Sequence, residues 1–159
     1  MTTLNDRIKE IGMLMGQLTI DEELKGPWLF SCHNENGQQY IGAWIYGKEG
    51  ETWWLYAPVT ADRLAAYQSG KLWLHKLFDE PEKTLLFFVI TKGDQIVLNS
   101  AVPSMLMDLV FVPGYEDSYF DDKMEMIRTG EVQQEVPTIE VIRGMLSRLN
   151  DRVKESSNE

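Results

Sequence analysis

Residues 40–59 read YIGAWIYGKEGETWWLYAPV, and this stretch decides the fold class. It contains two runs rich in aromatic and β-branched residues, which favour β-strands. The runs are separated by GKEG at 47–50, a short glycine-containing segment typical of a turn. Two strands joined by so short a turn pair antiparallel, so the sequence predicts a β-hairpin at the centre of the chain.

The two faces of this predicted hairpin are both apolar. Side chains alternate across a strand, so one face carries Ile41, Ala43 and Ile45. The aromatic residues of the opposite face are Trp44, Tyr46, Trp54 and Tyr56. Two interpretations follow: helices of the same chain cover both faces, or the aromatic face is exposed and binds a protein or a small ligand.

Strand and helix signals continue on both sides of the hairpin. Strands are predicted for 28–32, 39–46, 52–59, 84–91 and 95–99, with Asn36-Gly37 as a hairpin turn. Thr60 is a candidate N-cap for a helix ending at Gly70, and a second short helix covers 72–78. We therefore expect an α+β fold: a twisted, mainly antiparallel sheet of about five strands, with two short inserted helices and a helix at each end.

The chain is expected to form a single domain over residues 1–159. Apolar residues at three- and four-residue steps predict helices at 3–18 and 138–154. Between them lie the sheet with its inserted helices, at 27–112, and an acidic loop at 113–136. No linker separates these parts in the sequence.

Composition excludes several classes of protein. The chain has 159 residues, 43% hydrophobic, with a formal net charge of −10. Such a charge repels phosphate backbones and anionic lipids, so we expect no direct nucleic-acid binding and no membrane association. The N-terminus lacks the features of a secretory signal, and Cys32 is the only cysteine. A cytoplasmic location is therefore expected.

The acidic loop at 113–136 has seven acidic residues against Lys123 and Arg128. Its densest part contains Glu116, Asp117, Asp121, Asp122 and Glu125. The segment could form a solvated loop, with or without a short helix, and its carboxylates could bind a hard cation, contact a basic partner or mimic nucleic-acid charge. Their spacing does not match the EF-hand pattern, and we expect neither a metal nor a cofactor.

Cys32 and His33 are the most reactive residue types that stand together in the sequence. Neighbours on a strand point to opposite faces, so these two cannot form a nucleophile–base pair without a bulge. Cys32 could instead meet His75, with Asp79 one helical turn away to orient the imidazole. No spacing requires this, and we expect no catalytic residue.

The C-terminal helix has a narrow apolar stripe. Its residues are Ile139, Ile142, Met145, Leu149 and Val153. The stripe could pack within the chain or pair with the same stripe of a second copy in a homodimer.

Several segments together resemble a bacterial domain family of unknown function. They are GPWLF at 26–30, NGQQYI at 36–41, WLYAPVTADRL at 54–64, SGKLWL at 69–74 and FDEPE at 78–82. The resemblance covers roughly residues 24–115, and most shared positions are turns, caps and core. It therefore implies a fold and no reaction.

From these observations we expect a non-enzymatic accessory or regulatory module that acts through a protein partner, such as an antitoxin-like or phage-defence component. The alternative is a small-molecule or nucleotide sensor with a pocket beside Trp44, Trp54 and Tyr56. An enzyme that uses Cys32 or His75 ranks third.

Overall fold

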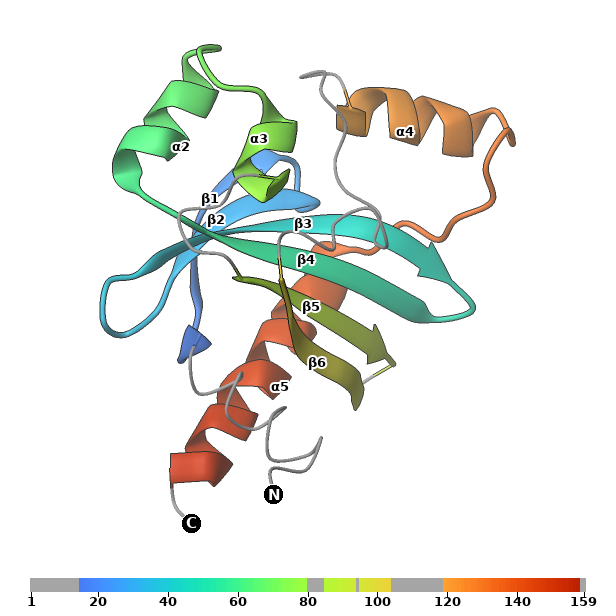
Figure 1. Ribbon diagram of the computed structural model, residues 1–159. Helices are drawn as coiled ribbons and strands as arrows, with labels where there is room; N and C mark the ends of the chain where they lie inside the picture. The colour runs from blue at the N-terminus through green and yellow to red at the C-terminus, as the bar shows by residue number, and fades with distance from the viewer. Residues whose placement is uncertain (1–14, 80–84, 94, 104–118, 158–159) are drawn as a thin grey trace.

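The computed structural model describes residues 15–79, 85–93, 95–103 and 119–157. Its strands are β1 (Thr19–Lys25), β2 (Leu29–His33), β3 (Gln39–Lys48), β4 (Glu51–Val59), β5 (Leu85–Lys92) and β6 (Gln95–Pro103). Its helices are α2 (Ala61–Gln68), α3 (Leu74–Asp79), α4 (Tyr119–Arg128) and α5 (Ile139–Ser157). The fold is α+β, as the sequence predicts (Figure 1).

The strands form one sheet in the order β1-β2-β3-β4-β5-β6, and every neighbouring pair is antiparallel. Within the described residues the sheet has six strands, where about five were expected, because Thr19–Lys25 adds an edge strand. The turns use residues that accept a positive φ, such as Gly37 (80°) and Gly50 (79°). The Asn-Gly turn and the GKEG turn are thus confirmed.

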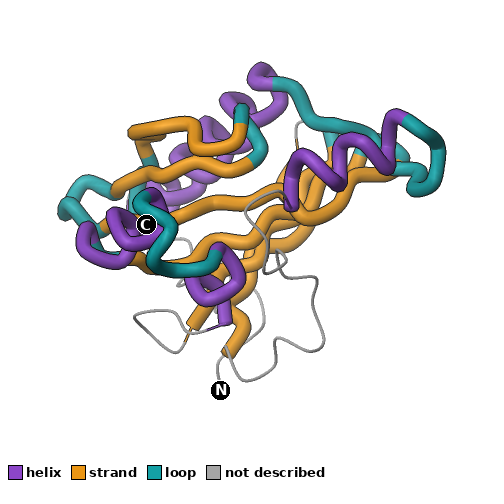
Figure 2. The backbone as a smooth tube through the Cα atoms, turned by 90° about the horizontal axis from the view of Figure 1, so that it is seen from above, coloured by secondary structure: helices purple, strands orange, loops and turns teal. Residues whose placement is uncertain are grey.

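Helices cover both faces of the sheet. On one face, α5 packs its apolar side against Phe30, Trp44, Trp54 and Tyr56. On the other face, α2 and α3 pack against the aliphatic residues of β3 and β4, and Phe120 of α4 joins the same cluster. Figure 1 shows α5 on the opposite side of the sheet from α2 and α3, and Figure 2 shows the same backbone from above, with helices and strands overlapping in the view. The result is a three-layer arrangement with two separate apolar cores.

The predicted inserted helices are both present. Thr60 is the N-cap of α2, and its hydroxyl accepts a hydrogen bond from the Arg63 backbone N–H at 3.3 Å. The C-terminal helix extends over 139–157, close to the predicted 138–154. No helix within the described ranges is long and apolar enough to cross a membrane.

One predicted boundary was wrong, and the alternative of a short helix within the acidic loop is confirmed. The helix predicted for 3–18 falls mostly outside the described residues, but its last part is not helical: Gly16 has a φ of 74°, and β1 begins at Thr19. Within the predicted acidic loop, residues 119–128 form α4. Phe120 is almost completely buried, so α4 is held by apolar packing that a solvated loop would lack.

Candidate functional site

The predicted aromatic binding face is not a surface. Trp44, Trp54 and Tyr56 are each 0% exposed and form the centre of the core under α5. Their large apolar area is buried by the chain itself, which is the default use of such residues. The expectation of an exposed aromatic patch was therefore wrong for these three residues.

Tyr46 does not share the face of Trp44. The β3–β4 register pairs Trp44 with Trp54 but Tyr46 with Trp53, so a bulge interrupts the alternation at this point. The rings of Tyr46 and Trp53 lie 4.9 Å apart, and Trp53 packs against the core cluster of the opposite face. The bulge thus divides the four aromatic residues between the two sides of the sheet.

Cys32 and the histidines do not form a catalytic group. Cys32 is 0% exposed on the α5 side of the sheet, and burial strongly raises the pKa of its thiol. His33 is partly exposed, and its Nδ1 lies 2.6 Å from Oδ1 of Asp21. His75 belongs to α3, which packs on the other face of the sheet from Cys32. The sheet therefore separates the two residues that an enzyme would need to bring together.

The apolar stripe of α5 faces its own sheet. Ile142, Met145 and Leu149 are at most 3% exposed, and all three belong to the core cluster with Trp44 and Trp54. Ile139 is half-buried, and the side chain of Val153 lies outside the described residues. The stripe covers the aromatic sheet face, so the idea of a homodimer formed through these buried positions was wrong.

The acidic residues of α4 lie together on its solvent side. Asp121, Asp122 and Glu125 are exposed, whereas Glu116 and Asp117 lie outside the described residues. Asp121 accepts from Nζ of Lys25 at 3.4 Å, and Glu125 pairs with Arg128 one turn along the same helix. We call Asp121, Asp122, Glu125 and the neighbouring Met126 the acidic face of α4.

The inner side of α4 holds Lys123, whose position in the sequence indicates only a charged residue among carboxylates. Its Nζ donates to the backbone carbonyl of Ile45 at 2.7 Å and lies 4.1 Å from the centre of the Trp44 ring. Tyr119 contributes a second ring, 5.8 Å from the same nitrogen. Burial lowers the pKa of Lys123 to about 7. The cation–π contact and the carbonyl together hold α4 on the end of β3.

Lys123 has no carboxylate partner in the described part of the chain. The consequence is a separation of charge across α4: the carboxylates face solvent and the amine faces the core. Met126, 40% exposed, lies among those carboxylates. A helical signal was present in the sequence, because Phe120, Met124 and Ile127 recur at four- and three-residue steps.

The segment that follows α4 crosses the β3–β4 hairpin. The Glu135 backbone N–H donates to the Gly47 carbonyl at 2.8 Å, and the Glu135 carboxylate accepts from the Gly50 N–H at 2.8 Å. Further along, the Trp28 indole donates to the Pro137 carbonyl at 2.9 Å. The segment between α4 and α5 passes from one face of the sheet to the other, and these hydrogen bonds hold it against β2 and the β3–β4 hairpin. They thereby fix the positions of both helices relative to the sheet.

Residues 8–111 match the model of a family of unknown function, DUF6575. The chain belongs to this family. The match includes all six strands with α2 and α3, and it begins well before residue 24, where the sequence resemblance was placed. Both α4 and α5 follow the matched residues. No curated protein and no solved structure gives a significant match.

Proposed function

We propose that the chain is a non-enzymatic binding module that acts through a protein partner, and that the partner docks on the acidic face of α4. The observation that carries this proposal is the division of charge across the helix. Asp121, Asp122 and Glu125 are exposed, while Lys123 is withdrawn against Trp44. The solvent-exposed side of α4 is thus more negative than the net charge of all its residues suggests.

The formal charge of α4 illustrates this. Three acidic and two basic residues give −1 for the helix. Lys123 is withdrawn from the surface, and with a pKa of about 7 its amine carries about half a positive charge at pH 7. Arg128 is paired with Glu125. The exposed carboxylates of α4, of which Asp121 also contacts Lys25, suit a partner that presents lysine or arginine side chains around an apolar contact for Met126.

The rest of the molecule supports binding over catalysis. The lone thiol is buried and its pKa is raised, so it is a poor nucleophile. The net charge of −10 opposes a nucleic-acid partner. We extend the proposal to the bacterial cytoplasm, where an acidic module of this kind would neutralise a basic toxin in an antitoxin-like or phage-defence pair.

The test is capture of partners by three matched versions of the chain. The first is wild type, and the second carries Asp121→Asn, Asp122→Asn and Glu125→Gln. The third removes the same number of negative charges elsewhere, at exposed sites on β1, the β3–β4 turn and α5. These control substitutions are Glu23→Gln, Glu49→Gln and Asp151→Asn.

We expect that wild type and the control variant capture the same basic protein, and that the α4 variant does not. Its affinity should fall about tenfold or more for the α4 variant, and added salt should weaken the wild-type complex. If the α4 variant and the control retain the same partners equally, the acidic face is not the docking surface.

A further inference from the structure

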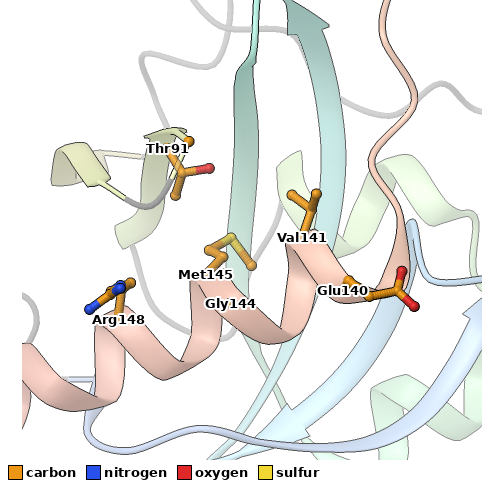
Figure 3. Close-up of a pocket in the computed structure, with 7 residues that line it drawn as sticks. Thr91, Glu140, Val141, Gly144, Met145 and Arg148 are labelled. Carbon is orange, nitrogen blue, oxygen red and sulfur yellow. The ribbon is translucent and has the colours of Figure 1, made fainter.

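A groove separates α5 from the end of β5, away from α4. Thr91 and Gly93 form one wall, and Val141, Gly144, Met145 and Arg148 of α5 form the other. The groove has a volume of about 270 Å³, near the lower limit of small-molecule sites. Figure 3 shows the α5 side chains along one helix, with Thr91 opposite Met145.

Gly144 is unusual because neither the helix nor its packing requires a glycine at this position. It lies inside α5, where glycine is among the least favourable residues. A Cβ added at this position would meet nothing within 4 Å, so no packing in the described chain explains the missing side chain. Gly144 lines the groove, and the absence of a side chain leaves room for a ligand against the helix backbone.

The groove offers an apolar surface to such a ligand. Val141 is 40% exposed, one of the few large apolar side chains in the described ranges with that much exposure. Met145 lies beside it, and its sulfur accepts a hydrogen bond from the Tyr56 hydroxyl at 3.7 Å. The thioether is therefore held in place by the core beneath it while it lines the groove.

Arg148 supplies a charge at one end. It is exposed, and no carboxylate in the described part of the chain pairs with its guanidinium. An unpaired guanidinium is the preferred side chain for carboxylates and phosphates because it donates two parallel hydrogen bonds. In a chain of net charge −10, this is a localised positive site.

Glu140 sets the direction of binding. It lines the groove two helical turns before Arg148, about 12 Å along the axis at 1.5 Å per residue. Figure 3 shows Glu140 and Arg148 at opposite ends of the α5 wall. A carboxylate at one end and a guanidinium at the other favour a ligand whose single anionic group points toward Arg148.

We infer that this groove binds a small organic anion, with an apolar body against Val141 and the helix backbone at Gly144 and a carboxylate or phosphate group on Arg148. The site is independent of the acidic face of α4. It gives the chain a ligand-binding role in addition to its proposed partner.

The test is isothermal titration calorimetry with four probes. The probe 3-phenylpropionate has the apolar body and a carboxylate, and phenyl phosphate replaces the carboxylate with phosphate. The neutral analogue 3-phenylpropanol lacks the anion, and inorganic phosphate lacks the apolar body. We expect one of the first two probes to bind about tenfold more tightly than both of the others. The tighter of the two identifies the anionic group.

Variants of the groove complete the test. Arg148→Gln should weaken binding about tenfold, whereas Arg143→Gln, an exposed arginine of the same helix outside the groove, should leave it unchanged. Gly144→Leu should abolish binding because its side chain fills the groove. Circular dichroism shows whether that variant folds, and Gly144→Val, with a smaller side chain, is used in its place if it does not.

Three results would overturn the inference. The first is that neither anionic probe binds with a dissociation constant below about 1 mM, which is already a weak affinity. The others are that 3-phenylpropanol binds as tightly as the anionic probes, or that Arg148→Gln and Arg143→Gln change the affinity equally. The variant with Asp121→Asn, Asp122→Asn and Glu125→Gln should still bind the probe. Binding of the probe by this variant shows whether the groove works independently of the acidic face of α4, so the two proposals can be refuted separately.

Discussion

Lys123 should make the stability of the folded chain depend on pH in an unusual direction. Burial lowers its pKa from 10.5 to about 7. Between these values the unfolded chain holds a proton on Lys123 that the folded chain has lost. Stability rises with pH wherever the unfolded state binds more protons, so Lys123 destabilises the fold most below pH 7 and progressively less above it.

The size of the effect follows from the two pKa values. Between pH 7 and pH 9, this one group should raise the free energy of unfolding by about 2 kcal/mol. The Trp44 ring and the Ile45 carbonyl both favour the charged amine, and part of the side chain remains in contact with solvent. The figure of about 2 kcal/mol is therefore the upper end of the expected gain.

The assay is urea denaturation of wild type and Lys123→Met at pH 7, 8 and 9. Methionine keeps an unbranched side chain of similar length and cannot titrate. The free energy of unfolding of wild type should rise relative to the variant across this range, since all other titrating groups are common to both chains. Lys71→Met, at an exposed position, is the control and should follow wild type at every pH. Parallel pH profiles for wild type and Lys123→Met would refute the reasoning.

Three further substitutions test the fold. Trp44→Ala should lower the free energy of unfolding by about 3–5 kcal/mol in urea denaturation, because the ring is 0% exposed. Gly47→Ala should cost about 1–3 kcal/mol, since its Cβ would lie 2.2 Å from the Glu135 carbonyl oxygen; by contrast, Gly144→Ala should stabilise the chain by up to about 1 kcal/mol in the same measurement. The Cys32 thiol should react with iodoacetamide, followed by mass spectrometry, only after unfolding, because it is buried and its pKa is raised.

The central hairpin was predictable because its signals are local. The strand predicted for 52–59 is observed at 51–59, and the GKEG turn lies between the two strands as expected. Alternation and turn chemistry act over a few residues, so one sequence is enough to read them. The bulge before Tyr46 was not predictable in this way, because no residue type in YIGAWIY requires an irregular pairing there.

The partner of each apolar surface was harder to predict. The sequence shows an aromatic sheet face and an apolar helix stripe, but it does not say whether they pack on each other. The structure pairs them through contacts such as Tyr56 with Met145, which lie 89 positions apart in sequence. Long-range packing of this kind depends on the path of the whole chain, here on the crossing held by Glu135 and Gly47.

The extent and packing of α4 were hard to predict for a different reason. Seven acidic residues in a short stretch are typical of solvated loops, and they concealed an apolar repeat at Phe120, Met124 and Ile127. The role of Lys123 was concealed as well, because a lysine between aspartates indicates a surface position. Only the fold places its amine against Trp44.

Both proposed surfaces lie on helices that follow the residues matched by the family model. Each of these helices has an inner side that the fold needs, with Phe120 on α4 and Ile142 on α5. Each also has an outer side that packing does not explain: the carboxylates of α4, and Gly144 with Arg148 on α5. Substitutions of the α4 carboxylates and of Arg148 should therefore change binding while the free energy of unfolding stays nearly constant. This separation makes the two proposed binding surfaces testable independently of the sheet that supports them.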